Sequence, residues 1–300
     1  MMMQPLQGSF VALVTPMFPN GDLDYVSLKN LIDWQINKGI SGIVSVGTTG
    51  ESATVNVKEH VEIIEKTIEY TNGRVPVIAG TGANSTQEAI ELTQTANNLG
   101  ADYALVVTPY YNKPNQDGLI KHYLKIADEV NIPLILYNVP SRTACDLEPK
   151  TVSHLSAHPK IIGIKEAVDN EKRMDELLAI SKKLKDKKNF SILSGDDPTF
   201  NSFMEKGADG VISVAANIIP EDIAKICIFN LDKEFDKAID LNNKFLNLYD
   251  LLFVESNPIP VKWALEKMNK IESGIRLPLV SLNEAFHEEI SKELSKLELI

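Results

Sequence analysis

Eight short runs of apolar and β-branched residues recur along the chain, and each ends in a small, polar or proline-containing turn. The runs read FVALVTP, GIVSVGTTG, PVIAGTG, YALVVTPYY, PLILYNVP, IIGIKEA, FSILSGDD and GVISVAAN, and they begin near residues 10, 43, 76, 103, 133, 161, 190 and 210. Most intervals are about 30 residues, the length of one strand-helix unit. Runs that are apolar throughout are typical of parallel strands buried on both faces. The pattern therefore predicts an α/β protein with a (β/α)8 TIM barrel fold.

The segments between these runs have apolar residues at helical spacing. Residues 26–36 and 61–68 repeat such residues every three or four positions, which predicts amphipathic helices. Ser85 followed by Glu88 has the spacing of a capping box at a helix start. Gly100 stands where a left-handed helix end is expected. Helices and strands therefore alternate, as the barrel requires.

The pattern changes after the eighth run. Residues 220–300 contain several amphipathic stretches and no strand pattern, with breaks at 257–258 and around 274–278. We therefore expect the barrel over residues 1–225 and a C-terminal helical region over residues 226–300.

Composition and charge narrow the class of partner. The chain has 300 residues, 44% of them hydrophobic, and a formal net charge of −11. No cluster of Lys and Arg offsets the acidic excess, so we expect no nucleic-acid partner and favour a small molecule. An anionic ligand would be repelled by this surface, so its site must supply its own cationic or N–H donors.

Neither targeting nor metal chemistry is indicated. The start, MMMQPLQGSF, lacks the basic and apolar parts of a signal peptide, and no apolar stretch reaches the roughly 20 residues of a membrane span, so we expect a cytoplasmic protein without membrane contact. Cys145 and Cys227 are expected to stay reduced. His154 and His158 have i,i+4 spacing but no further ligand pattern, so we expect no metal.

Chemistry in this barrel class lies at the C-terminal ends of the strands. Lys165 directly follows the apolar residues 161–164 and is expected to project into the barrel mouth. Desolvation there favours the neutral amine, which a Schiff-base lysine needs to attack a carbonyl. The alternative is that Lys165 pairs with Glu166 or reaches out to water.

Three other features at or just after strand ends also have two interpretations each. The turn at 47–51 pairs glycines with hydroxyls and can cradle a carboxylate, or it simply reverses the chain. Tyr137 either bonds a partner such as a Thr hydroxyl or packs in the core. Arg142 either holds a substrate carboxylate through two parallel N–H hydrogen bonds from its guanidinium group or makes a surface ion pair.

Four motifs together resemble one enzyme family. They are GTTGES at 47–52, VVTPYYNKP at 106–114, LYNVPSRT at 136–143 and GIKEA at 163–167. They are similar to those of the dihydrodipicolinate synthase family, and the similarity continues through SGDD, GVISVAAN and SNPIPVKWAL over essentially the whole chain.

The resemblance implies an enzyme that uses no cofactor. It would condense pyruvate with L-aspartate 4-semialdehyde to 4-hydroxy-tetrahydrodipicolinate, on the route to diaminopimelate and lysine. Lys165 matches the lysine that forms an imine with pyruvate. The imine then loses a methyl proton, the resulting enamine attacks the aldehyde, and cyclisation through the amino group releases Lys165.

The resemblance also assigns the remaining site residues. Those matching a proton relay are Thr48, Tyr137 and Tyr111, with Tyr111 reaching over from a neighbouring subunit. Thr48 and Thr49 match groups that hold the pyruvate carboxylate, and Arg142 matches the group that receives the semialdehyde carboxylate. Gly195 and Ile212 match backbone positions that line the pyruvate pocket. The family usually forms homotetramers, as dimers of dimers.

A feedback site for lysine is implied as well. The matching residues are Ser52, Ala53, His60, Asn84, Glu88 and Tyr110. Val57 departs from the family, where a polar group commonly stands, so inhibition by lysine is expected to be weak. Ala144 replaces a glycine that is usual after the SRT loop, which should stiffen this loop.

Two alternatives compete with this interpretation. One is a sister pyruvate-dependent aldolase, such as N-acetylneuraminate lyase or a keto-deoxy sugar-acid aldolase, which shares the lysine and the tyrosine. Sister lyases commonly show GSTGE in place of Thr48-Thr49, and they do not usually keep both Tyr110-Tyr111 and Arg142. The other is a non-catalytic barrel that binds a keto acid, against which the joint presence of Lys165, Tyr137 and Thr48 argues.

Overall fold

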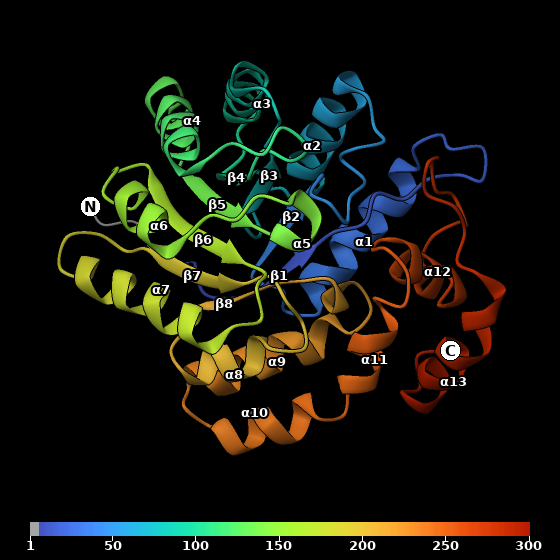
Figure 1. Ribbon diagram of the computed structural model, residues 1–300. Coiled ribbons are helices and arrows are strands. Elements are labelled where there is room, and N and C mark those ends of the chain that lie inside the picture. Colours follow the sequence, from blue (N-terminus) through green and yellow to red (C-terminus); the bar gives the residue numbers. More distant parts are fainter. Residues whose placement is uncertain (1–5) are drawn as a thin grey trace.

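Eight parallel strands close into a barrel in the order of the sequence (Figure 1). The computed structural model describes residues 6–300. Residues 1–5 lie outside the described residues. They belong to the expected barrel segment and to the N-terminal stretch that was expected to lack a signal peptide. The strands are β1 Gly8–Ala12, β2 Gly42–Ser45, β3 Val77–Gly80, β4 Tyr103–Val107, β5 Leu134–Asn138, β6 Ile161–Glu166, β7 Ser191–Ser194 and β8 Gly210–Ser213. Each begins within two residues of its predicted start, which confirms the barrel.

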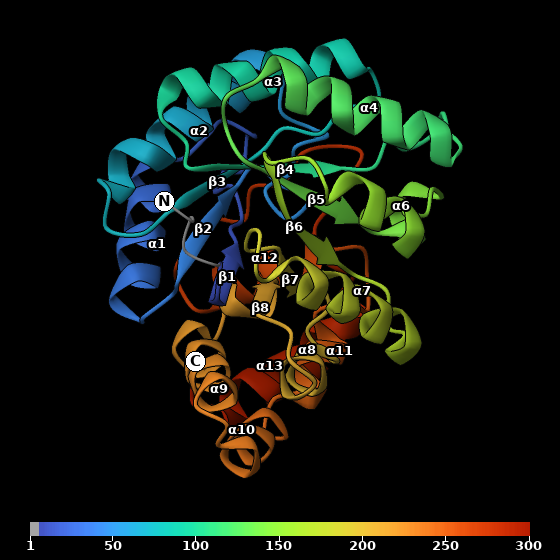
Figure 2. The same cartoon turned by 90° about the vertical axis from the view of Figure 1, so that its left-hand side faces the viewer.

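Helices follow the strands and form the outer layer. They are α1 Tyr25–Asn37, α2 Val57–Thr71, α3 Thr86–Leu99, α4 Gln116–Glu129, α5 Pro140–Thr143, α6 Pro149–Leu155, α7 Glu171–Leu184, α8 Phe200–Glu205 and α9 Pro220–Leu231. Figure 2 shows α2, α3 and α4 along one side of the barrel and α8 and α9 along the opposite side. Apolar stripes on these helices pack against the outer faces of the strands, as the helical spacing predicted.

The helix ends show which local signals the fold uses. Gly100 ends α3 in the left-handed conformation, as predicted. The Ser85 side chain accepts a hydrogen bond from the Glu88 backbone N–H, but the Glu88 side chain lines a cavity, and no return bond completes the predicted capping box. A complete capping box instead begins α2, between Asn56 and Glu59.

The core has two parts because strand residues alternate between the inside and the outside of the barrel. The inner part is a cluster of side chains that includes Phe10, Ile78, Ile135, Leu193 and Ile212. The outer part fills the layer between strands and helices. Because side chains fill the interior, a ligand site is expected at the barrel mouth.

The C-terminal part of the chain is helical. It contains α10 Phe235–Asn242, α11 Leu246–Leu251, α12 Ile259–Lys267 and α13 His287–Lys296. Figure 1 shows α11, α12 and α13 grouped at one side of the barrel. The expected boundary at residue 225 falls inside α9. The division of the chain into a barrel and a C-terminal helical region stays a prediction. Between residues 6 and 300, no helix combines the length and the apolar character that crossing a membrane requires.

Candidate active site

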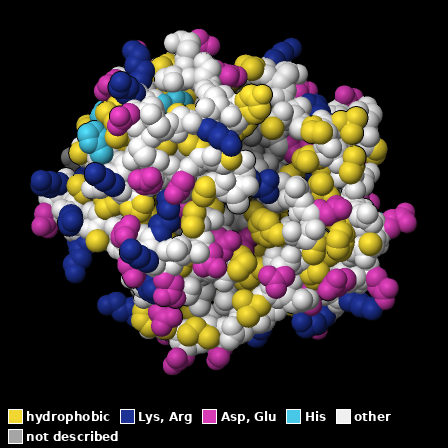
Figure 3. Space-filling model, in the orientation of Figure 1, with side chains coloured by type: hydrophobic (Ala, Val, Ile, Leu, Met, Phe, Trp, Pro, Cys, Tyr) yellow, Lys and Arg dark blue, Asp and Glu magenta, His cyan; other side chains and the backbone are white. Residues whose placement is uncertain are grey.

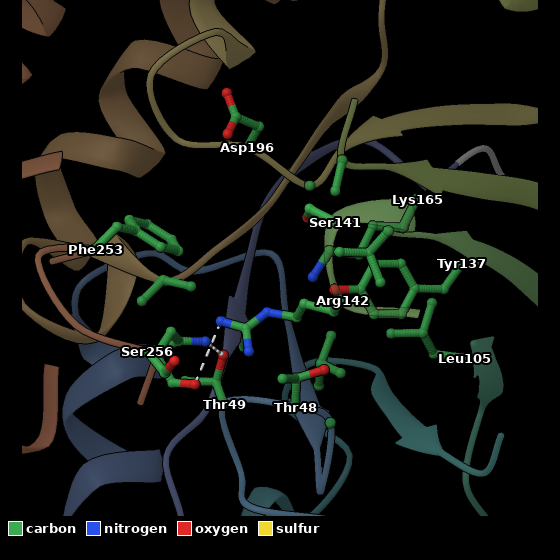
Figure 4. A pocket seen from close by; sticks show the side chains of 18 residues that line it. Thr48, Thr49, Leu105, Tyr137, Ser141, Arg142, Lys165, Asp196, Phe253 and Ser256 are labelled. Carbon is green, nitrogen blue, oxygen red and sulfur yellow. Dashed lines mark hydrogen bonds between the residues drawn. The ribbon is translucent and has the colours of Figure 1, made fainter. Parts of the chain in front are cut away.

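A cavity of about 530 Å³ opens at the C-terminal ends of the strands. Six of the predicted substrate-site and catalytic residues line it, namely Thr48, Thr49, Tyr137, Arg142, Lys165 and Gly195. Figure 4 shows Lys165 and Tyr137 together on one wall, with Arg142 extending from their side toward Thr49. On the face drawn in Figure 3, acidic and basic side chains are interspersed, so any selective attraction for an anion has to arise inside the cavity.

Lys165 is buried at the end of β6, beside Tyr137 on β5. The two residues are register partners across the strands, and the Lys165 Nζ lies 4.5 Å from the centroid of the Tyr137 ring. Gly195 closes the other side, where an added Cβ would stand 2.8 Å from Cε of Lys165. A side chain at position 195 would therefore displace Lys165, and with glycine there the amine is held between an aromatic face and a bare stretch of backbone.

Glu166 does not pair with Lys165, because its fully buried side chain faces a separate polar cluster. The Asn138 Nδ2 donates to both carboxylate oxygens at 3.0 and 3.2 Å, and the Arg173 Nε donates at 2.8 Å. Arg173 in turn bonds Asp146 at 2.6 Å. Burial raises the pKa of Glu166 to about 7, although Arg173 and Asn138 act to lower it. The predicted alternative for Lys165, an ion pair with its neighbour, is therefore not formed.

The turn that carries Thr48 and Thr49 is tightly constrained. Val46 and Glu51 have φ of 52° and 59°, and a Cβ on Gly50 would stand 2.9 Å from the Val46 Cα. Glu51 is fully buried and forms an ion pair with Lys262 of α12. The two threonine side chains are thus presented to the cavity by a turn that has little freedom to move.

Arg142 comes from the short helix α5, which directly follows the strand that carries Tyr137. The Thr143 Oγ1 anchors this helix by bonding the carbonyl oxygens of Val139 and Cys145 at 3.2 and 2.9 Å. Ala144 ends the helix in the left-handed region with φ of 51°, a conformation that favours glycine. The structure thus gives a physical reason for the glycine that was expected at this position.

Two predicted residues do not line the cavity. The Tyr111 side chain is 91% exposed, and Ile212 is fully buried in the barrel interior. A role for Tyr111 in a neighbouring subunit, and for the Ile212 backbone beside the substrate, both stay predictions.

A second cavity of about 330 Å³ adjoins the first and shares Thr48, Val139 and Arg142 with it. All six residues of the expected lysine site line it, namely Ser52, Ala53, His60, Asn84, Glu88 and Tyr110, and so does the divergent Val57. The His60 Nε2 lies 2.7 Å from the carbonyl oxygen of Gly80, and burial lowers the pKa of its ring. The predicted residues are therefore brought together, although they come from separate loops and helices.

Sequence reasoning gave no role to several side chains of the first cavity, which are Ser141, Asp196, Phe253, Ser256 and Asn257. Burial raises the pKa of Asp196. Asn257 donates from Nδ2 to the Thr49 Oγ1 at 2.9 Å, and its carbonyl oxygen accepts from Arg142 at 3.4 Å (Figure 4). The family-like motif SNPIPVKWAL contains Ser256 and Asn257, and it was the only available signal for them.

The histidine pair considered as a metal site is used differently. The His158 Nε2 lies 3.3 Å from Asp128 Oδ1 at the end of α4. Over the described part of the chain, no three His, Cys, Asp or Glu side chains are grouped so that they could hold a metal ion.

Comparisons with known proteins agree on one family. The model of the dihydrodipicolinate synthetase family matches residues 5–297. A 4-hydroxy-tetrahydrodipicolinate synthase from Teredinibacter turnerae is 50% identical over 95% of this chain and 96% of its own. A dihydrodipicolinate synthase from Acinetobacter baumannii, solved in complex with pyruvate, superposes with a TM-score of 0.94 at 50% identity, covering 98% of this chain and 100% of its own. The enzyme from Cyanidioschyzon merolae, solved with lysine bound, superposes with a TM-score of 0.93 at 32% identity, covering 99% of this chain and 100% of the Cyanidioschyzon chain.

Proposed function

Because this chain belongs to the dihydrodipicolinate synthetase family, we propose that it condenses pyruvate with L-aspartate 4-semialdehyde through a Schiff base on Lys165. Relatives about 50% identical over nearly the full chain are 4-hydroxy-tetrahydrodipicolinate synthases, so the chain is an enzyme of that activity in diaminopimelate and lysine biosynthesis. These relatives favour this activity over a sister aldolase or a non-catalytic barrel. The observation that carries the mechanism is the buried Lys165 amine over the Tyr137 ring, in a cavity with carboxylate-binding groups.

The first half of the reaction uses the wall that Lys165 and Tyr137 form. Pyruvate is an anion, and the hydroxyls and backbone N–H groups of the Thr48-Thr49 turn bind its carboxylate. The Lys165 amine then adds to the ketone carbon, and water leaves to form the imine. The protonated imine draws electrons from the methyl group, which loses a proton to give the enamine. Tyr137, next to the amine, passes protons to and from the reacting atoms together with Thr48.

The second half uses Arg142, which extends from the side of Lys165 and Tyr137 toward Thr49. The guanidinium of Arg142 receives the semialdehyde carboxylate with paired N–H donors. The enamine carbon attacks the aldehyde carbon and forms the new C–C bond, and the imine on Lys165 is restored. The substrate amino group then attacks this imine carbon, which closes the ring and releases the lysine amine. The part of the cavity beside Phe253 and Ser256 offers room for this second substrate.

The subunit arrangement and the feedback site extend the proposal. Tyr111 is exposed on its own subunit, as a residue that completes a neighbour's proton relay must be, and we place it in a homotetramer built as a dimer of dimers. Lysine binds in the second cavity, and its ammonium group meets Glu88 there. Val57 gives this cavity an apolar wall, so binding of lysine is weak. The proposal also places the protein in the cytoplasm.

Borohydride reduction with pyruvate tests the mechanism, because it converts an imine into a stable secondary amine. Mass spectrometry should find the adduct on the Lys165 peptide and only when pyruvate is present. Lys188 and Lys262 are internal controls. Lys188 is half-buried, Lys262 is buried, and neither lines the cavity. An unmodified Lys165 peptide in the presence of pyruvate would exclude the proposed mechanism.

A further inference from the structure

We propose that Asn257, which the C-terminal helical part contributes, is a positioning residue that directs the Thr49 hydroxyl proton toward the pyruvate carboxylate. The inference rests on the proposed function, because it takes Thr49 as a group that binds this carboxylate. Asn257 is buried, lies in the cavity wall and donates from Nδ2 to the Thr49 Oγ1 at 2.9 Å. The contact joins residues 208 positions apart in the chain.

The direction of this hydrogen bond decides what Thr49 can do. A threonine hydroxyl has one proton to donate and two lone pairs that accept. When its oxygen accepts from the Asn257 amide, its own proton is left for another acceptor. A carboxylate is an acceptor only, so it pairs with a hydroxyl that is held in this state. Asn257 therefore prepares Thr49 as a donor before pyruvate arrives, which saves reorganisation on binding.

Asn257 also connects Thr49 with Arg142 across the cavity wall. Its carbonyl oxygen accepts from Nη2 of Arg142 at 3.4 Å, while its side chain holds Thr49. One residue thus sets the spacing between the group for the pyruvate carboxylate and the group for the semialdehyde carboxylate.

The segment that carries Asn257 is itself fixed to the Thr49 turn. Helix α12 begins two residues later, and its Lys262 forms the buried ion pair with Glu51 and donates to the carbonyl oxygen of Thr15 at 3.1 Å. The Thr15 hydroxyl in turn donates to the carbonyl oxygen of Gly50 at 2.7 Å. The amide of Asn257 is therefore held in register with Thr49 from a rigid support.

Two substitutions separate polarity from packing. Asn257→Ala removes the side-chain donor but keeps the carbonyl that Arg142 uses. Asn257→Asp keeps the shape but offers only acceptors, so it takes the Thr49 proton and adds a negative charge beside both carboxylate sites. Loss of one such hydrogen bond raises the KM for pyruvate about fivefold in Asn257→Ala, and Asn257→Asp raises it further. The KM for the semialdehyde changes much less in Asn257→Ala.

The experiment measures both KM values together with borohydride trapping at graded pyruvate concentrations. Asn230→Ala is the matched control, because Asn230 is equally buried, in α9, and its Nδ2 also donates to side-chain and backbone oxygens outside the cavity. We expect this control to leave the KM for pyruvate unchanged. In the Thr49→Val background, Asn257→Ala should add little, because its partner is already gone.

The outcomes distinguish this inference from the proposed function. If the wild-type enzyme is not trapped at Lys165, the proposed function fails and the inference falls with it. If the wild type is trapped but Asn257→Asp keeps the wild-type KM for pyruvate, the inference alone is overturned. Independent, multiplicative effects of Asn257→Ala and Thr49→Val also overturn it. Should Asn257→Ala fail to fold, the near-isosteric Asn257→Asp still decides the matter.

Discussion

Replacing Lys262 by methionine should destabilise the protein more than any surface ion-pair substitution. Met has nearly the length of the lysine stem, so the change mainly removes the charge. Among the described residues, the fully buried Glu51 carboxylate would then keep two hydrogen-bond donors, the Arg276 backbone N–H and the Thr54 hydroxyl, both at 3.3 Å, with the Arg276 guanidinium as the remaining positive charge that acts on it. Burial already lowers the pKa of Lys262, which shows how poorly this site solvates a charge.

The magnitude follows from burial. Removing one partner of a buried ion pair costs about 3–5 kcal/mol, because the other charge is left uncompensated. At about 2.1 cal/mol/K of unfolding entropy per residue, and with 300 residues, this cost lowers Tm by about 5–8 °C. The exposed pair of Lys225 and Glu221 on α9 provides the matched control. Lys225→Met should cost about 0–1 kcal/mol, or less than about 2 °C.

Differential scanning calorimetry of Lys262→Met, Glu51→Gln and the double variant measures this effect. The double variant has no buried charge left in the pair, so it should recover most of the loss of Lys262→Met. A fall in Tm of less than about 2 °C for Lys262→Met would refute the reasoning. So would a double variant whose loss equals the sum of the two single losses.

Three further results are expected. Burial lowers the pKa of His122 to about 4 from an ordinary 6.5, so the folded state resists its protonation, and stability should fall by up to about 3 kcal/mol as the pH drops from about 6.5 to 4. Urea midpoints of His122→Gln should show a weaker pH dependence over this range, and an unchanged slope would contradict this cause. Arg142→Ala should lower kcat/KM for the semialdehyde more than borohydride trapping of pyruvate, and equal losses would reject its assigned role. Tyr111→Phe and Lys165→Ala should each be nearly inactive alone, yet a mixture that exchanges subunits should regain activity, because the site with an intact lysine then receives an intact tyrosine from its neighbour. A mixture as inactive as its components would show that Tyr111 does not act across subunits.

The sequence by itself determined the barrel and the position of Lys165 at its mouth. Each strand is a contiguous β-branched or apolar run, and each βα turn follows it directly, so the information is local. Because strand ends share one mouth in this fold, Lys165, Tyr137 and Thr48 were expected together and are found together. The roles of these residues depended on the resemblance to a family, since the local pattern alone left each with a second interpretation.

Only the tertiary structure decided which side chains support that site. Asn257 meets Thr49 across 208 positions, and Lys262 meets Glu51 across 211, distances at which no periodicity carries information. Glu88 shows the reverse case, because its spacing from Ser85 satisfies a capping box while its side chain lines the second cavity instead. Buried polar groups must find partners wherever the folded chain brings them, so long-range pairing is decided by packing and not by the neighbouring sequence.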